Sequence, residues 1–317
     1  MRIVPPTPEN LQNAATLLRA GGLVGLPTET VYGLAAHALD AAAVARIFTA
    51  KSRPHGHPLI VHVASWDDAR ALCRQLPPEA ERLAAAHWPG PLTMILPRAA
   101  HVPDVVTGGR DTVAVRVPAH PVALELLRVF GGPLAAPSAN RHEHLSPTTA
   151  AHVLASLGDA VDLVLDGGPT RAGIESTLID LCSTPPRLLR PGPIPPRALS
   201  LPTLQVEENL VQTTHVHDAP GLSRRHYAPR VPLRLVSRAE LVARAGEADV
   251  VWLACGEVDA VGRGLTLPRT PDGYAGGLYA ALHRLEDSGA QQILAEEPPD
   301  DDDWLAVRDR LRRASAP

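Results

Sequence analysis

Residues 21–33, GGLVGLPTETVYG, place a helix end, a strand and a polar turn next to one another. The two glycines end a helix that starts near Thr7 and carries an apolar face of leucine and alanine. Leu23–Leu26 predicts a short strand, and the turn after it offers the hydroxyls of Thr28 and Thr30. Open α/β sheets bind ligands just past their strand ends, so this stretch indicates both the fold class and the position of a site.

The alternation of helix and strand signals continues over residues 7–200. Strands are expected at 58–63, 92–96, 112–117, 134–136, 161–165, 176–181 and 187–189, and helices near 40–51, 65–76, 78–87, 120–130 and 147–157. Because several strands follow one another after residue 160, we expect an α/β domain with a twisted mixed sheet and flanking helices.

Residues 191 to about 232 are rich in proline and polar residues and predict a linker. Alternation then resumes, with strands expected at 233–236, 249–255 and near 291–298, and helices near 238–245, 274–287 and 303–313. This predicts a smaller C-terminal α/β domain of three layers. The acidic run 300–303 precedes the last helix, where carboxylates favour a helix N-terminus; we interpret it as a solvated cap rather than a metal site.

Composition limits the class of protein. The chain has 317 residues, 45% of them hydrophobic and 20% charged, which is enough for two globular domains. No apolar run reaches a membrane-spanning length and the first residues do not resemble a signal peptide, so we expect a cytoplasmic protein with no membrane contact. Three cysteines without CxxC spacing argue against disulfides and zinc. The net charge of −4 argues against a dedicated duplex-binding surface.

Common nucleotide and hydrolase motifs are missing. Lys51–Ser52 has no Walker-loop glycines before it, because positions 45 and 50 are alanine, and GxGxxG, HExxH and GxSxG patterns do not occur. What remains is a set of hydroxyls and cations near strand ends, supplemented by the glycine-rich segment DGGPTRAGIEST at 166–177. Such a cleft suits a polyphosphate and a small zwitterion, with catalysis by positioning and charge stabilisation.

Lys51 is the one lysine among 30 basic residues. One interpretation is a cation at the end of the helix 40–51, where it complements the helix dipole. The other is a position where a compact ammonium is required and a planar guanidinium does not fit.

Beyond these patterns, the chain resembles the YrdC-type L-threonylcarbamoyladenylate synthases in their long, two-domain form. The segments that match, in order, are GGLVGLPTETVYGL, AKSRP with HPLIVHV, WPGPLT, DTVAVRVPAHP, PLAAPSAN, SPT, DGG with GIESTLIDL, and LLRPGPI. Together they span about residues 10–195, and the later segments APGLSRRHYAP and LYAALHRLEDSGAQQILAEEPP extend the resemblance over nearly the whole chain.

The resemblance implies a YrdC-like catalytic domain at 1–200, a linker at 201–232 that folds over the active site, and a Rossmann-like domain at 233–317. It also implies condensation of L-threonine, bicarbonate and ATP, with Mg²⁺, to threonylcarbamoyl-AMP, water and pyrophosphate. This product serves threonylcarbamoyladenosine modification of tRNA. The implied partners are therefore the downstream tRNA threonylcarbamoyl transferase complex and, through a weak contact, tRNA itself.

The same correspondence assigns site residues. The K-x-R motif gives Lys51 and Arg53 as catalytic residues, and L-threonine is expected to contact Thr28, Thr30, His62, Arg116 and Ser176. ATP is expected to contact Lys51, Arg53, His57, Thr112, Ser138, Asn140, Ser146, Arg190 and Tyr227, with no protein-held metal. Tyr227 of the linker is expected to help exclude water from the carbamate.

Two departures from the family pattern stand out: His57 replaces an asparagine that is common there, and the segment after Pro232 is short for a second domain. Two alternatives stay open. One is a related enzyme such as the carbamoyl-transferring domain of hydrogenase maturation proteins, against which the missing zinc-finger cysteines argue. The other is an RNA-binding module without catalysis, which the acidic balance disfavours.

Overall fold

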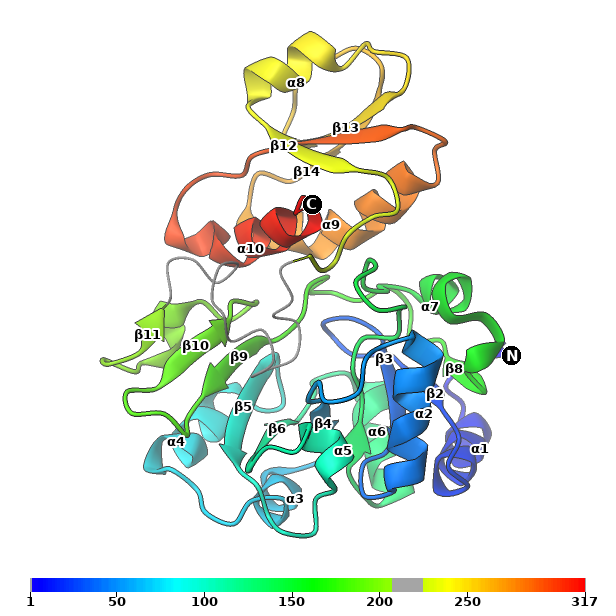
Figure 1. The fold of residues 1–317 in the computed structure, drawn as a ribbon, viewed down its shortest axis with the longest axis vertical. Helices are drawn as coiled ribbons and strands as arrows, with labels where there is room; N and C mark the ends of the chain where they lie inside the picture. The colour runs from blue at the N-terminus through cyan, green and yellow to red at the C-terminus, as the bar shows by residue number, and fades with distance from the viewer. Residues whose placement is uncertain (1, 207–224, 317) are drawn as a thin grey trace.

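The computed structural model describes residues 2–206 and 225–316, which form a larger N-terminal and a smaller C-terminal domain (Figure 1). In the described residues the larger domain has an eleven-stranded sheet in the order β1-β8-β2-β3-β7-β4-β6-β5-β9-β10-β11. The smaller domain has a four-stranded sheet in the order β12-β15-β13-β14. The predicted linker 201–232 lies largely outside the described residues.

The strands of the larger sheet are β1 (Ile3–Val4), β2 (Val24–Leu26), β3 (Gly33–His37), β4 (Ile60–His62), β5 (Leu92–Pro97), β6 (Thr112–Arg116), β7 (Leu134–Ala135), β8 (Leu163–Leu165), β9 (Thr177–Asp180), β10 (Arg187–Arg190) and β11 (Gln205–Val206). Its helices are α1 (Pro8–Arg19), α2 (Ala41–Lys51), α3 (Trp66–Ala71), α4 (Pro78–His87), α5 (Asp104–Thr107), α6 (Pro121–Phe130) and α7 (Ala150–Leu157), with 3₁₀ turns η1 (Gly158–Ala160) and η2 (Pro196–Leu199).

The C-terminal elements are β12 (Leu233–Val236), α8 (Arg238–Arg244), β13 (Val250–Cys255), β14 (Arg263–Leu267), α9 (Pro271–Glu286), β15 (Gln292–Glu296), η3 (Asp302–Trp304) and α10 (Leu305–Ala314). The four strands run parallel. Helix α8 covers one face of this sheet, and α9 and α10 cover the face toward the larger domain (Figure 1). The expected three-layer α/β arrangement is therefore confirmed.

The larger sheet is mixed, as expected. Strand β3 runs antiparallel to β2 and to β7, whereas β4 runs parallel to β6 and antiparallel to β7. The register pairs His62 at the end of β4 with Arg116 at the end of β6. Ile60 and His62, two residues apart on β4, point to the same face of the sheet, and both line the site together with Arg116 and the loop after β7. The site therefore lies over one face of these strands.

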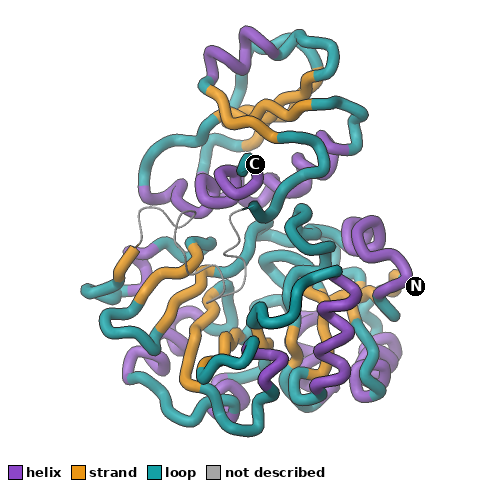
Figure 2. Tube along the Cα trace, viewed as in Figure 1, coloured by secondary structure: helices purple, strands orange, loops and turns teal. Residues whose placement is uncertain are grey.

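Helices surround the strands of the larger domain (Figure 2), and strand β3 has an apolar layer on each of its faces. Leu34 of β3 faces the layer formed by α2 and α7, whereas its neighbour Ala35 faces the layer formed by α1 and α6. Successive strand residues point to opposite faces, so each face receives alternate side chains. Helix α1 begins at Thr7, whose hydroxyl accepts a hydrogen bond from the Asn10 amide, which is the cap that the sequence predicts.

Some elements differ from the predictions. Strand β3 was not predicted because GLAAH lacks the β-branched and aromatic residues that mark strands; it forms because it pairs on both edges. Strand β14 was also not predicted, and the helix expected at 65–76 ends at Ala71. In the acidic run, Asp301 caps the 3₁₀ turn η3, since its carboxylate accepts from the Asp303 amide, whereas the last helix, α10, has Trp304 at its N-cap and no side-chain cap. Among the described residues, no helix is both long and apolar enough to span a bilayer.

Candidate active site

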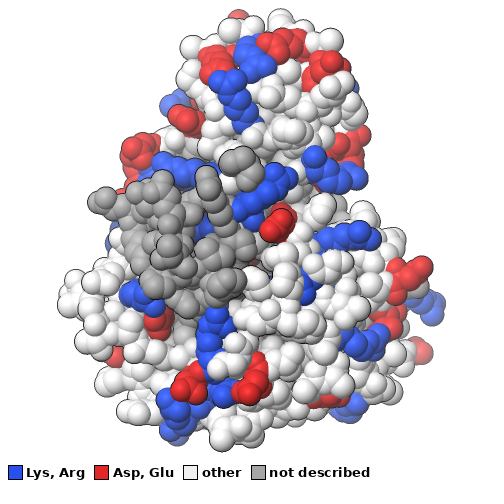
Figure 3. Space-filling model, in the orientation of Figure 1, with Lys and Arg blue, Asp and Glu red and all other residues white. Residues whose placement is uncertain are grey.

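A cavity lies over one face of the central strands of the larger sheet, beneath the C-terminal domain. Its polar lining comes from the β2–β3 turn, the end of α2, strands β4 and β6, the loop after β7, the β9–β10 region and the segment that precedes β12. The polar lining residues are Thr28, Thr30, Lys51, Arg53, His62, Arg116, Ser138, Asn140, His142, Glu143, Glu175, Ser176, Arg190, His226 and Tyr227. On the face drawn in Figure 3, basic side chains gather at the junction of the two domains.

Lys51 lies at the C-terminal end of α2, where Ser52 adopts a left-handed conformation and ends the helix. Its side chain is 2% exposed, and Nζ donates to the carbonyl oxygens of Ser138 and Asn140 at 2.5 Å each. Burial and, less strongly, Arg53 lower the pKa of Lys51 well below its usual value, and Glu175 opposes this. The ammonium is thus held by backbone carbonyls, and an anionic ligand would stabilise its charged form.

Arg53 and Asn140 flank Lys51. The Arg53 guanidinium is buried and donates to the Pro58 carbonyl at 3.4 Å, and burial lowers the pKa of Arg53 to about 10. The Asn140 amide nitrogen donates to the carbonyls of Arg141 and His144, which fixes its orientation. These contacts hold one guanidinium and one amide oxygen toward the cavity.

A second cluster lies at the ends of β4 and β6. Arg116 donates from Nε to the Gly90 carbonyl at 3.1 Å and from Nη1 to the Thr30 hydroxyl at 2.9 Å, and its Nη2 lies 2.7 Å from Glu29. The Thr30 hydroxyl is 2.9 Å from that of Thr28. His62 is buried beside Arg116, and burial, then this guanidinium, lower the pKa of His62 to about 3, so its ring is neutral at pH 7.

Ser176 and Arg190 form the opposite wall. Arg190 donates to the Ser176 hydroxyl at 3.0 Å and to its carbonyl at 3.1 Å. The Ser176 hydroxyl also lies 2.7 Å from that of Thr93 on β5, so it is fixed from two sides.

Several buried polar atoms in this cavity have no hydrogen-bond partner among the described residues. They are Arg53 Nε, His62 Nδ1, Asn140 Oδ1, His226 Nδ1 and the Tyr227 hydroxyl. Buried polar groups in native proteins are nearly always paired, and leaving one unpaired costs about 1–3 kcal/mol. Such a concentration around one cavity is typical of a site that pairs its polar groups with a ligand.

The structure brings most of the predicted site residues together: Thr28, Thr30, Lys51, Arg53, His62, Arg116, Ser138, Asn140, Ser176, Arg190 and Tyr227 all line the cavity. His57 lies beside it, with its ring centroid 5.7 Å from that of His142. Ser146 is buried one layer behind and donates to Glu175 at 2.5 Å. Thr112 is not brought into the cavity; it begins β6, four residues before Arg116, and lines a separate depression beside Arg74 and Pro97.

Four polar lining residues were not predicted: His142, Glu143, Glu175 and His226. Glu175 stands within the GIEST segment that the sequence analysis singled out, so position along the chain was a usable signal for it. Lysine, arginine and hydroxyl side chains were chosen for their affinity for anions, and this criterion passes over carboxylates.

Fold and cavity define a class: a two-domain α/β protein with an enclosed, cation-rich site suited to a small anionic ligand. Residues 16–192 match the family model described as "Telomere recombination", and residues 194–316 match that described as "Threonylcarbamoyl-AMP synthase, C-terminal domain". The chain belongs to the threonylcarbamoyl-AMP synthase family.

Relatives of full length support this assignment. A threonylcarbamoyl-AMP synthase of Pyrococcus abyssi is 43% identical, covering 95% of this chain and 93% of its own length. One of Bacillus subtilis is 37% identical, covering 96% and 92%. The crystal structure of P. abyssi Sua5 complexed with L-threonine superposes with a TM-score of 0.93 at 40% identity, covering 99% of this chain and 98% of that one.

Proposed function

We propose that this protein is an L-threonylcarbamoyladenylate synthase, a nucleotidyltransferase that converts L-threonine, bicarbonate and ATP to threonylcarbamoyl-AMP, pyrophosphate and water. The amino nitrogen of threonine forms a bond to the bicarbonate carbon and water leaves. An oxygen of the resulting carbamate then attacks the α-phosphorus of ATP, and pyrophosphate leaves. Both steps need positioning of reactants and stabilisation of negative charge more than a strong base.

The observation that carries the proposal is the set of unpaired buried polar atoms on Arg53, His62 and Asn140 around one cavity that the buried guanidinium of Arg116 also lines. The polar lining forms two groups, one suited to the nucleotide and one suited to the amino acid. One group surrounds Lys51, whose ammonium is buried among carbonyls. The other surrounds Arg116, beside the hydroxyls of the β2–β3 turn. Names of the relatives agree with this division, and the P. abyssi structure carries L-threonine.

In this proposal Arg116 pairs with the threonine carboxylate: its guanidinium is buried in the cavity wall, and its Nη2 makes an ion pair with Glu29 without a hydrogen bond. The threonine subsite is completed by Thr28, Thr30, His62 and Ser176. The neutral ring of His62 can accept a hydrogen bond there. A neutral ring suits a pocket that must also hold an ammonium or amine.

Lys51 and Arg53 then face the triphosphate and stabilise the charge that moves to the leaving pyrophosphate. Ser138, Asn140 and Arg190 line the same part of the cavity. His57 is assigned to the nucleotide's edge and Ser146 to a supporting role through Glu175, while Thr112 is the weakest member of the ATP set because it lies outside the cavity lining. Tyr227 closes the cavity and reduces access of water to the carbamate.

Mg²⁺ enters this proposal as part of the substrate Mg-ATP. The described residues contain no group of three or more His, Cys, Asp or Glu side chains arranged to hold a metal. Mg²⁺ in phosphoryl-transfer sites is commonly held by one or two carboxylates and the substrate phosphates, so a cavity without a metal cage is compatible with it.

The product is a reactive mixed anhydride, so we further propose that it is passed to a tRNA threonylcarbamoyl transferase complex, with at most a weak contact between this protein and tRNA. A cytoplasmic location follows from that role.

The experiment is identification of the product. Purified protein is incubated with Mg-ATP, L-threonine and ¹³C-bicarbonate, and the mixture is analysed at once by mass spectrometry. The proposal predicts a threonine–carbonyl–AMP adduct that carries the ¹³C label. AMP and pyrophosphate without any labelled adduct would show a different adenylate chemistry. If no turnover occurs and the protein retains labelled RNA in a separate binding assay, the binding-module alternative is supported.

A further inference from the structure

Glu175 is the buried carboxylate of the cavity, and two of the side chains that bind it belong to the C-terminal domain. Its Oε1 accepts from the Ser146 hydroxyl at 2.5 Å. Its Oε2 accepts from the Tyr279 hydroxyl of α9 at 3.0 Å and from Arg310 Nε of α10 at 2.7 Å. A wall of the substrate cavity is therefore tied to the second domain.

Arg310 is fully buried at this contact and uses its whole guanidinium. Besides Glu175, it donates from Nη2 to the Pro191 carbonyl at 3.0 Å and from Nη1 to Asp309 at 2.6 Å. Asp309 in turn pairs with Arg313, one turn away, at 2.9 Å. Such a network fixes the orientation of the guanidinium, and a planar fork is the group best suited to hold a carboxylate.

The same two residues hold Tyr227. The guanidinium carbon of Arg310 lies 5.0 Å from the centroid of the Tyr227 ring, and the Tyr279 ring lies 5.9 Å from it. Tyr227 has a φ of +58°, a backbone conformation that a tyrosine adopts only when its surroundings enforce it. Helices α9 and α10 supply part of those surroundings.

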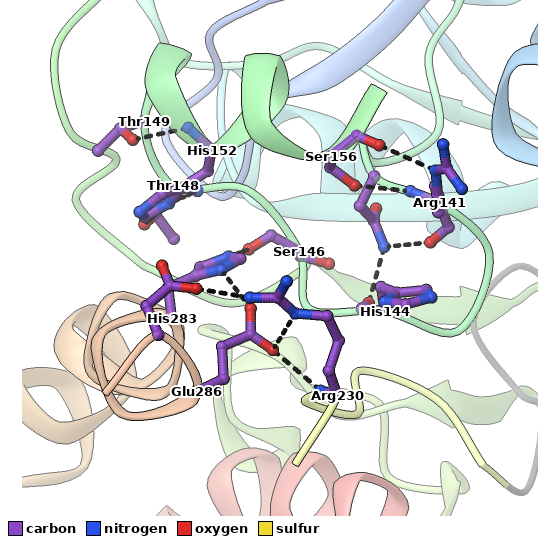
Figure 4. Close-up of polar contacts among 12 residues, drawn as sticks. Arg141, His144, Ser146, Thr148, Thr149, His152, Ser156, Arg230, His283 and Glu286 are labelled. Carbon is purple, nitrogen blue, oxygen red and sulfur yellow. Dashed lines mark hydrogen bonds and ion pairs between the residues drawn. The ribbon is translucent and has the colours of Figure 1, made fainter. Parts of the chain in front are cut away.

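Two further contacts join α9 to the cavity loops. His283, one turn after Tyr279, has its Nε2 3.2 Å from the Ser146 carbonyl, and Figure 4 shows it directed at that loop. Gly173, two residues before Glu175, packs so closely that a Cβ there would lie 2.3 Å from the Ala275 carbonyl. The GIEST segment and the Ser146 loop are thus both seated on α9.

Charge explains why these contacts matter for a polyanion. Lys51, Arg53 and Arg190 attract phosphates, but Glu175 in the same cavity repels them unless its charge is balanced. Burial raises the pKa of Glu175, but the opposite effect of Arg310, and after it of Arg190, is larger. The pKa is therefore below its usual value and the carboxylate stays ionised. A buried carboxylate without its cation is strongly unfavourable.

We propose that Tyr279 and Arg310 are positioning residues of the substrate cavity: they neutralise and orient Glu175 and seat Tyr227, so that the C-terminal domain completes the site for Mg-ATP. The proposal rests on the proposed function for its substrate. It assigns the smaller domain a role in nucleotide binding that is exerted through Glu175 and Tyr227 rather than by direct contact.

The experiment compares Arg310→Gln and Tyr279→Phe with matched controls on the same helices. Arg312→Gln changes an exposed arginine of α10. Tyr274→Phe removes a buried hydroxyl of α9 that has no hydrogen-bond partner in the described part of the chain. For each full-length variant, the Kd of Mg-ATP is measured by calorimetry, and KM and kcat by pyrophosphate release, with folding checked by circular dichroism.

Loss of a hydrogen bond to a charged group predicts a rise of about tenfold or more in the Kd and KM for ATP in Arg310→Gln, and of about threefold to tenfold in Tyr279→Phe. Both controls should stay within about twofold, since surface and unpaired groups contribute little. Adding Glu175→Gln to Arg310→Gln should recover part of the loss, because the unbalanced charge is then gone.

Unchanged Kd and KM for ATP in folded Arg310→Gln would overturn the proposal. A double variant, Arg310→Gln with Glu175→Gln, that binds ATP more weakly than Arg310→Gln alone would also overturn it. If Arg310→Gln does not fold, Tyr279→Phe decides alone, and constants equal to those of Tyr274→Phe would overturn it. If the wild type binds Mg-ATP but releases no pyrophosphate with threonine, the proposed function fails while the Kd values still decide the positioning roles. A wild type without ATP binding overturns both.

Discussion

Replacement of Lys51 by arginine keeps the charge and changes only the shape of the cation. In the structure the ammonium is 2% exposed and lies 2.5 Å from two carbonyl oxygens, those of Ser138 and Asn140. A guanidinium is longer and planar, so it must displace this loop or leave its pocket. Overpacking of this kind costs about 1–3 kcal/mol. If about 2 kcal/mol of this is lost from the transition state, kcat/KM falls roughly 30-fold.

The assay is pyrophosphate release with saturating threonine and bicarbonate and varied Mg-ATP. Arg46→Lys is the control, because Arg46 lies on the same helix with a side chain that is 48% exposed. We expect its kcat/KM to match that of the wild type. A folded Lys51→Arg variant with kcat/KM within about threefold of the wild type would refute the argument that this pocket requires an ammonium.

Three other predictions concern binding and pH. Arg116→Lys removes the fork that reaches Thr30 and should raise the KM for threonine about tenfold or more with a smaller effect on ATP; equal KM values for threonine in both proteins would count against the threonine subsite. Thr112→Ala should leave the KM for ATP within about twofold, because Thr112 lies outside the cavity, and a large rise would restore it to the ATP set. Acid should destabilise the fold through His62: its pKa is lowered to about 3 when folded and is near 6.5 when unfolded, so the unfolded chain binds more protons between these values and stability falls as the pH drops below about 6.5. The free energy of unfolding, measured by denaturant titration from pH 8 to 4, should therefore fall less steeply in His62→Gln, by up to about 1.4 kcal/mol per pH unit, and parallel curves would contradict the assignment.

The sequence was sufficient for elements whose local signals agree with their tertiary setting. Helix α1 has its Thr7 cap, its apolar face and its glycine stop, and all three appear in the structure. Strand β3 shows the limit of such reasoning. Its alanines carry no strand preference, and only pairing with β2 and β7 makes it a strand.

The site residues were predictable where the side chain carries a positive charge that suits an anionic ligand. Lys51, Arg53 and Arg116 were chosen as cations near strand ends, and they line one cavity. Thr112 shares a strand face with Arg116, but four residues along a strand span about 13 Å, which carries it out of the cavity.

The contribution of the C-terminal domain could not be predicted from the sequence. Tyr279 and Arg310 are 104 and 135 positions from Glu175, and nothing in their local sequence distinguishes them from other buried or surface residues. Only the packing of α9 and α10 on the larger domain brings them to that carboxylate (Figure 1).

Pyrophosphate release by the purified full-length chain tests the account most directly. The protein is supplied with Mg-ATP, L-threonine and bicarbonate, and each of the last two is omitted in turn from solutions freed of carbon dioxide. We predict release that requires both threonine and bicarbonate. Release that persists without threonine, or no release with all substrates present, would contradict the proposed synthase activity.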